Sequence, residues 1–429
     1  RSTPLRSNQR IRVSASPQSS THPAQPHRSL RTVIRGLSGI FRRTSEGLER
    51  YFSDPSRYER VRAHALTRWM AQRRTQQLMG IMTGFVQSQV LLLCVRLRIL
   101  EHLAPNPLDA ATLARRLGLQ EAGLRCVLDS AVSMRLLNKQ ADNRYALGVL
   151  AHPVLAHSGI RAMVEHNHLL YKDLAEPEGF LQEGARGHMA AYWPYAQEEG
   201  ARPAMQPQAR EQSVAYSGLM DASQNFVVSE VLDSYPFARH RCVLDIGCGM
   251  GRFGGELAKR FATLRIQLLD LPHVTQLAQD RLRAAGLGPQ LTFWGRSFLD
   301  GPLPQGADLV TLIRVAHDHA DGVVQQLFGL IWQALPVGGK LLLAEPMVLA
   351  DGSSGASGGS WGSARECDPY FHFYMRAMGR GRLRSQQELT RLLRSAGFAA
   401  VKRVPTAMPI HAQMLVATKT SVYPDMTTG

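Results

Sequence analysis

The clearest pattern in the chain is the alternation of short apolar runs with longer amphipathic stretches after residue 241. Short apolar runs bounded by glycine, proline or polar residues are typical of buried strands. We predict seven strands, at 242–246, 264–269, 291–294, 309–313, 340–344, 399–404 and 413–417. Because helical spacing fills the gaps between them, the pattern predicts an α/β, doubly wound (Rossmann-like) fold, with helices on both faces of a parallel sheet.

The chain before residue 241 shows helical spacing instead. Apolar residues three and four positions apart predict a helix within 57–100; they are Leu78, Ile81, Met82, Phe85 and Val86. A second helical region, 160–235, is rich in tyrosine, tryptophan and histidine. That composition suits either the lining of an apolar pocket or an ordinary core.

A winged-helix pattern lies between these two helical regions. Asp109 is a candidate N-cap and Gly118 a candidate C-terminal stop of a first helix, and a second helix and a turn-rich wing follow. Such a module binds DNA in some proteins and forms dimers in others. In the second helix Arg125 is balanced by Glu121 and Asp129, whereas a groove-reading helix usually carries more positive charge. We favour dimerisation over nucleic-acid binding, and keep a winged-helix DNA-binding regulator as the alternative from another class.

Charge changes this picture only at the N-terminus. The chain has 50 basic and 34 acidic side chains, a net charge of +16. The first 50 residues hold ten arginines and two acidic residues, so the rest of the chain is only mildly basic. A basic tail attracts anionic lipid or nucleic acid, and an Arg/Ser-rich leader also fits a transit peptide. A solvated, disordered tail is the simpler interpretation.

Cysteine usage and hydropathy suggest a cytoplasmic protein. The five cysteines show no short spacing of the metal or redox kind, and a sparse, odd set is typical of a reducing compartment. We therefore expect no metal. The most apolar stretch, 81–100, is interrupted by two glutamines and two arginines, and its longest unbroken run is 90–95. Because a bilayer requires roughly 20 apolar residues, we predict no membrane span.

The strongest chemical signal is the glycine-rich segment Asp245-Ile-Gly247-Cys-Gly249-Met-Gly251, which directly follows the first predicted strand. A glycine turn between a strand and a helix lets the backbone approach a ligand closely. The same glycines, with Gly254, also fit a dinucleotide fingerprint, which alone is weak support.

Two acidic residues favour a different nucleoside cofactor. Asp245 lies inside the strand, where a carboxylate suits a positively charged ammonium group and disfavours a pyrophosphate. Asp270 ends the next strand, about 20 residues past the glycines, where an acid holds ribose hydroxyls. Together they favour S-adenosylmethionine (SAM), with a simple helix cap as the competing interpretation of Asp270.

Candidates for proton transfer follow the fourth and fifth strands. His317 comes after the fourth strand and Glu345 ends the fifth, and reacting groups in open α/β sheets gather beyond the carboxyl ends of strands. A histidine near neutral pKa can accept a proton from an attacking hydroxyl, and Glu345 can orient it. A structural histidine is the competing interpretation. Asp318 and Asp321 fit caps of the following helix.

At these residues the chain resembles the plant caffeate-type and acetylserotonin-type O-methyltransferases. The resemblance rests on 245–251, 317–321, 335–340 and Glu345-Pro346. Other segments are similar to a bacterial branch, the demethylspheroidene O-methyltransferases of carotenoid biosynthesis; they lie at 85–98, 163–166, 170–175, 192–196, 312–315, 318–321 and 377–382. The resemblance covers roughly 50–418.

The resemblance implies a homodimer that binds SAM and methylates a hydroxyl of an apolar carotenoid in photosynthetic pigment biosynthesis, with peripheral contact to the photosynthetic membrane. It places the base on His317, although the carotenoid branch often has tyrosine there. Gly295-Arg-Ser297-Phe298 replaces the Gly-Asp-Met-Phe of plant enzymes, so Ser297 or Phe298 is expected at the adenine. A related bacteriochlorophyllide methyltransferase makes methylation of a tetrapyrrole carbon the runner-up.

These inferences divide the chain into five segments. We expect a disordered basic tail at 1–45 and a helical winged-helix dimerisation domain at 46–160. A helical linker lining the substrate pocket follows at 161–240, helped by the aromatic helix at 369–378. The SAM-binding methyltransferase domain is expected at 241–418, before a flexible tail at 419–429.

Overall fold

The computed structural model describes the chain over 68–182, 187–192, 221, 224–348, 364–379, 381–407 and 412–420, with a few positions between 54 and 63. The chain forms two compact units, 1–86 and 87–429. The predicted tail at 1–45, most of the Gly/Ser-rich stretch at 349–366 and residues 421–429 lie outside the described residues.

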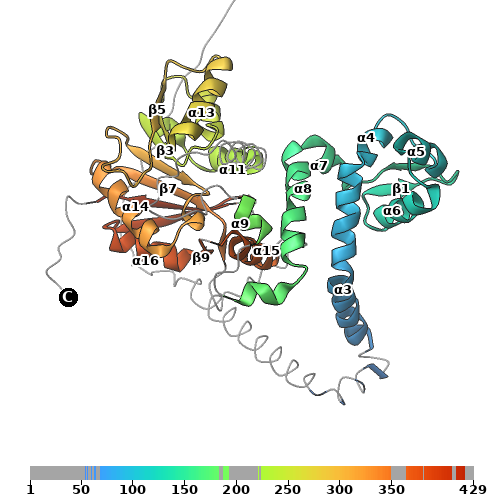
Figure 1. The fold of residues 1–429 in the computed structure, drawn as a ribbon. Coiled ribbons are helices and arrows are strands. Elements are labelled where there is room, and N and C mark those ends of the chain that lie inside the picture. Colours follow the sequence, from blue (N-terminus) through green and yellow to red (C-terminus); the bar gives the residue numbers. More distant parts are fainter. Residues whose placement is uncertain are drawn as a thin grey trace, which may run out of the picture. The chain divides into compact units, whose positions relative to one another are not determined.

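The second unit contains a seven-stranded sheet with the order β10-β11-β7-β6-β3-β4-β5. Figure 1 labels β3, β5 and β7 of this sheet. Its strands are β3 (Cys242–Ile246), β4 (Arg265–Asp270), β5 (Leu291–Gly295), β6 (Leu309–Ile313), β7 (Lys340–Glu345), β10 (Ala400–Val404) and β11 (Gln413–Thr418). Each predicted strand is therefore confirmed to within one residue at each end.

One expectation about the sheet was wrong. The five strands from β7 to β5 are parallel, but β11 runs antiparallel to both β7 and β10. The reason is the link between β10 and β11: residues 405–412 are too few for the crossover that parallel neighbours need. The sheet is mostly, and not wholly, parallel.

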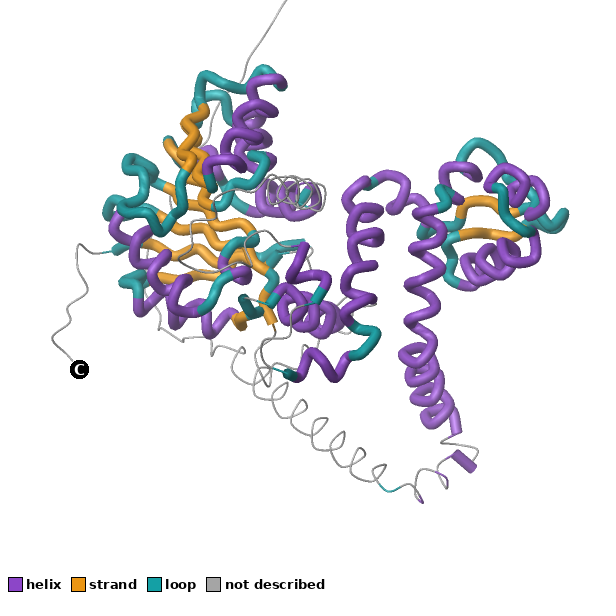
Figure 2. The backbone as a smooth tube through the Cα atoms, viewed as in Figure 1, coloured by secondary structure: helices purple, strands orange, loops and turns teal. Residues whose placement is uncertain are grey.

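Helices cover both faces of the sheet, as Figure 2 shows. On one face lie α11 (Asn225–Ser234), α12 (Arg252–Arg260) and α13 (Pro272–Ala284), whose apolar residues pack with Val243 and Leu342. On the other lie α14 (Asp321–Ala334) and α16 (Gln386–Ser395), which pack with Leu244 and Leu343. Neighbouring strand residues thus enter opposite cores, as the two-residue period of a strand requires.

The sheet domain extends slightly further than the sequence suggested. Lys419, which the sequence places in the flexible tail, is buried, and its ammonium donates to the carbonyls of Trp332 and Leu335 at 2.8 and 2.7 Å. Its backbone also bonds to Gly338 and Gly339. The packed region therefore includes Lys419.

A smaller helical cluster stands apart from the two sheet cores. It is formed by α8 (Ser158–Asp173), α9 (His188–Tyr192) and α15 (Ala364–Met378), with Leu170, Met189 and Met378 in its core. Inside it, His166 Nε2 lies 3.1 Å from the hydroxyl of Tyr374. Burial lowers the pKa of His166 to about 4, so this histidine is neutral at pH 7.

The winged-helix pattern is present as expected. Helices α4 (Ile99–Leu103), α5 (Ala110–Leu117) and α6 (Glu121–Ser133) precede an antiparallel wing, β1 (Leu137–Lys139) with β2 (Tyr145–Leu147), and α7 (Ala151–Ala156) follows. Asp109 accepts from the Thr112 amide at 2.7 Å, and Gly118 ends α5 in the left-handed region. Arg125 of α6 is ion-paired with Glu121.

Helix α3 (Arg68–Arg96) bears on the expectation that no segment spans a membrane, which stays a prediction. Its segment Ala71–Arg96, 26 residues, is long and apolar enough to cross a membrane by length and composition, although the interrupted apolar runs had suggested otherwise. Only 22% of its most apolar window is buried, and Ile81 and Phe85 are among its exposed side chains. Length and composition alone do not distinguish a span from an apolar helix that another protein surface covers.

Candidate active site

The glycine turn after β3 is built from left-handed residues. Gly247, Gly249 and Gly251 have φ angles of 70, 54 and 72°, a region that other residues enter only at a cost. A Cβ on Gly247 would lie 2.6 Å from Val315, and one on Gly251 would lie 2.7 Å from Leu282. A Cβ on Gly249 would meet nothing within 4 Å. The turn is therefore closely packed at both ends and open in the middle, where a ligand can approach.

Asp270 fixes the shape of this turn. One carboxylate oxygen accepts from the Gly249 amide at 2.8 Å, and the other accepts from the Leu271 amide at 2.7 Å. Each oxygen keeps a further lone pair for a hydroxyl donor. Desolvation raises the pKa of Asp270 to about 6 despite these hydrogen bonds.

Asp245 is more deeply placed than the sequence suggested. It is 2% exposed, within β3, and its carboxylate accepts from the Thr311 hydroxyl of neighbouring β6 at 2.8 Å. Burial, with a smaller contribution from the charge of Asp270, raises the pKa of Asp245 to about 7. The two acids thus lie at the same end of the sheet, and a nearby cation would favour ionisation of both.

The turn after β5 lies beside Asp270, because the Arg296 amide donates to the Asp270 carbonyl at 2.8 Å. Ser297 uses its hydroxyl locally, accepting from the Leu299 amide at 3.1 Å. The ring of Phe298 packs on the sheet core and meets the His319 ring edge-on, with centroids 5.3 Å apart. Ser297 and Phe298 therefore both lie in the turn after β5, and their contact with the adenine stays a prediction.

A carboxylate organises the turn after β6. Glu345, 1% exposed at the end of β7, accepts from the amides of Val315 and Ala316 at 2.9 and 2.7 Å and from the His317 amide at 3.4 Å. The turn starts at Arg314, which has a φ of 57°, an unfavourable value for a residue with a side chain. Strained backbone of this kind is concentrated at functional sites.

His317 lies between two carboxylates. It is buried in the short 3-10 helix η3 (Ala316–Asp318), with Nδ1 2.5 Å from Glu345 Oε2 and Nε2 3.3 Å from Asp318 Oδ1. Burial and the charge of Arg314 act to lower the pKa of His317. The charges of Asp318 and Glu345 and the hydrogen bond to Glu345 raise it, and together they outweigh the lowering effects. The pKa of His317 is raised.

The two aspartates after His317 do not have the capping role that the sequence suggested. The N-cap of α14 is Ala320, without a side-chain cap. Asp318 faces His317 instead, and Asp321, in the first turn of α14, pairs with Arg382 and Arg384. The position of Asp318 directly after the candidate base His317 could have indicated that it contacts the imidazole. Nothing in the sequence indicated a role for Arg384.

The parallel strands bring the candidate residues to one edge. The chain turns away from β3 toward β4 on one side and β6 on the other, and ligands of open α/β sheets bind at such a switch point. Across it, Gly247 packs against Val315, two residues before His317. Within the part of the chain that the structure describes, no cluster of three metal-ligating side chains is found.

This edge suits a nucleoside that carries a cation. Open space at Gly249 admits the ligand, Asp270 retains lone pairs for ribose hydroxyls, and the buried acids favour positive charge nearby. Strand order and turn together define a Rossmann-like methyltransferase of the SAM-dependent class.

Comparison with known proteins specifies the family. The family model for the O-methyltransferase domain matches residues 179–399, and the model for the O-methyltransferase dimerisation domain matches 79–156. Demethylspheroidene O-methyltransferase of Cereibacter sphaeroides is 37% identical over 83% of this chain and 90% of its own. The enzyme of the same name from Rhodobacter capsulatus is 36% identical over 81% and 83%. The chain belongs to the SAM-dependent O-methyltransferase family and carries its dimerisation domain.

Solved structures agree on the fold. Human N-acetylserotonin methyltransferase in complex with SAM superposes with a TM-score of 0.65 at 22% identity, covering 81% of this chain and 98% of that one. Mitomycin 7-O-methyltransferase gives a TM-score of 0.64 at 20% identity, covering 81% and 98%. The architecture is therefore shared at low sequence identity.

Proposed function

We propose that this enzyme transfers the methyl group of SAM to a hydroxyl of an apolar hydroxycarotenoid of the demethylspheroidene type. The observation that carries the proposal is the similarity to two demethylspheroidene O-methyltransferases over more than four fifths of the chain. A buried histidine flanked by carboxylates supports transfer to oxygen, since methylation of a carbon needs no base directed at a hydroxyl.

In this proposal the residues of the glycine turn would hold the cofactor. Asp270 would accept from the ribose hydroxyls, Asp245 would favour the positive charge, and Gly247, Gly249 and Gly251 would allow the backbone a close approach. Ser297 and Phe298 would contact the adenine. When bound, SAM supplies a methyl group on a sulfonium, which a nucleophilic oxygen can attack without a metal.

His317 then acts as the base. With a proton on Nδ1 that is donated to Glu345, Nε2 has a lone pair for the substrate hydroxyl. After Nε2 has accepted the proton, both N–H groups face carboxylates, Glu345 and Asp318, which stabilise the imidazolium. An alcohol is too weak an acid to ionise beforehand, so proton transfer accompanies attack. Alignment of oxygen and methyl in a dry site supplies much of the rate.

Substrate access and location follow from the same proposal. The helices α8, α9 and α15 border an apolar channel for the carotenoid, which the partner subunit of the homodimer helps to close. The enzyme acts in the cytoplasm next to the photosynthetic membrane, where an apolar substrate is concentrated. Exposed apolar side chains on α3, such as Ile81 and Phe85, support a contact with the partner subunit or with the membrane.

The test is incubation with labelled SAM and a pigment extract, comparing wild type with Asp270→Ala and His317→Ala. We expect label in a methoxycarotenoid with wild type. Asp270→Ala should lose SAM binding, whereas His317→Ala should bind SAM with unchanged affinity and lose turnover. Label only in bacteriochlorophyllide would refute the carotenoid assignment. Full activity of His317→Ala would refute the role of the base.

A further inference from the structure

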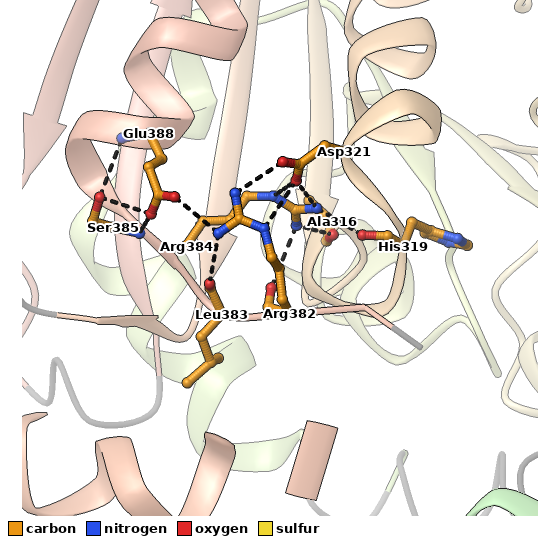
Figure 3. A network of polar contacts seen from close by, with 8 residues as sticks. All are labelled: Ala316, His319, Asp321, Arg382, Leu383, Arg384, Ser385 and Glu388. Carbon is orange, nitrogen blue, oxygen red and sulfur yellow. Dashed lines mark hydrogen bonds and ion pairs between the residues drawn. The ribbon is translucent and has the colours of Figure 1, made fainter. Parts of the chain in front are cut away.

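Arg384 binds the backbone carbonyl groups of the turn that contains His317, as Figure 3 shows for Ala316 and His319. Arg384 is 2% exposed, and its guanidinium donates to the carbonyl of Ala316 through Nη1 and to that of His319 through Nη2, both at 2.7 Å. Its Nε donates to Asp321 at 2.8 Å. One side chain therefore contacts the backbone on both sides of His317.

The chain just before Arg384 adds a second contact. The Arg382 amide donates to the His317 carbonyl at 3.0 Å. Gly381 has a φ of 74°, and a Cβ there would lie 2.0 Å from the His317 carbonyl oxygen and 2.7 Å from the Asp318 carbonyl carbon. Only glycine allows this approach, because both obstacles are backbone atoms and the φ angle is left-handed.

Arg384 is itself fixed in place. It belongs to β9 (Arg384–Ser385), which pairs with β8 (Met347–Val348) two residues beyond Glu345. Ser385 then begins α16 with a capping box that includes Glu388. Arg384 is thus held between a strand pair and a helix start, and little motion is available to its backbone.

We propose that Gly381 and Arg384 are positioning residues for methyl transfer, which hold the His317 turn by its carbonyls while Glu345 holds it by its amides. The inference rests on the proposed role of His317 as the base. Glu345 contacts the amides and Arg384 the carbonyls of the same short turn, so the imidazole has a defined direction before substrate binds. Arginine suits the task because its planar fork reaches two carbonyls and a carboxylate at once, which the single ammonium of lysine does not.

The decisive variant is Arg384→Lys, which keeps the charge and loses the fork. We expect kcat to fall about ten- to a hundredfold, because a misplacement of a reacting group by about 1 Å can cost about a hundredfold. The dissociation constant for SAM should change less than twofold, since the glycine turn and Asp270 are not touched. Gly381→Ala should likewise lower kcat while the dissociation constant for SAM stays nearly unchanged. Arg391→Lys, an exposed arginine on α16, is the matched control and should match wild type.

A second measurement does not depend on the substrate. In protein with labelled histidine, the imidazole of His317 is titrated by NMR. The pKa of His317 is set by Asp318, Glu345 and Arg314 around it, so a displaced turn should shift the titration to lower pH in Arg384→Lys and leave it unchanged in Arg391→Lys. SAM binding reports that each variant is folded.

The outcomes separate this inference from the proposed function. Wild-type kcat together with a wild-type titration in Arg384→Lys would overturn the positioning role. So would a parallel loss of SAM affinity and kcat, which indicates a general folding defect. Activity retained in His317→Ala would instead refute the base, and a shifted titration would then still show that Arg384 orients the imidazole.

Discussion

Two substitutions of Glu345 separate its effect on the stability of the turn at 315–317 from its effect on the proton chemistry of His317. Glu345→Ala removes the acceptor of two short amide hydrogen bonds, from Val315 and Ala316, in a buried site. A buried donor left without a partner costs about 1–3 kcal/mol, so the turn should lose about 2–6 kcal/mol of local stability. Glu345→Gln keeps one carbonyl acceptor for these amides, and should cost about 1 kcal/mol, the net contribution of one hydrogen bond.

Amide hydrogen exchange of residues 315–317 measures this directly, because it reports local opening. A loss of about 2 kcal/mol speeds exchange about 30-fold, since each 1.4 kcal/mol corresponds to about a factor of ten. Glu256→Ala is a suitable control, because Glu256 forms only an exposed ion pair with Lys259 on α12. Unchanged exchange at Val315 and Ala316 in Glu345→Ala would show that Glu345 does not hold the turn.

The chemical effect appears in the pH profile. Glu345 contributes to the raised pKa of His317, so Glu345→Gln should lower that pKa. The new amide nitrogen faces Nδ1 and favours the tautomer with the proton on Nε2, so kcat should fall at every pH. The activity that remains should rise at a lower pH than in wild type, because a base is active when unprotonated. A rise at the same pH in both proteins would mean that another group titrates.

Two further predictions concern the cofactor end of the site. The pKa values of Asp270 and Asp245 are raised to about 6 and about 7, and a cationic cofactor binds best when both carboxylates are ionised. The affinity for SAM should therefore increase from about pH 5.5 to about pH 8. Calorimetry in two buffers should detect proton release on binding near pH 6 and none at about pH 8.5. Gly251→Ala should lower the thermal midpoint strongly, costing about 2–4 kcal/mol through its left-handed φ and the overlap with Leu282, whereas Gly249→Ala should cost only about 1 kcal/mol and instead weaken SAM binding. Equal SAM affinity in Gly249→Ala and wild type would place the cofactor elsewhere.

The strands could be predicted from the sequence because strands of a sheet buried on both faces are continuous apolar runs. The antiparallel direction of β11 was missed, because an apolar run looks the same whichever way the strand runs. The eight-residue link 405–412, too short for a parallel crossover, was the available signal for β10 and β11. The glycines and acids could be found because the backbone conformation and the cofactor charge restrict the residue type.

The contacts around His317 were harder to predict. Asp318 fitted a helix cap by position, and only the structure shows that it faces Nε2. Arg384 bonds mainly to backbone carbonyls, which every residue has, so its partners leave no trace in the sequence. The left-handed Gly381 is constrained by a backbone more than sixty residues away in the chain.

The helical cluster of α8, α9 and α15 has an apolar core separate from those of the sheet. Neither Glu345 nor the glycines of the turn belong to that core, although Leu383, next to Arg384, does. If this cluster borders the acceptor, as proposed, the choice of molecule to be methylated can diverge between relatives while the reaction stays the same. The neutral His166 and Tyr374 are polar side chains within this apolar cluster, and substitutions at these two positions would change the polarity that the acceptor meets.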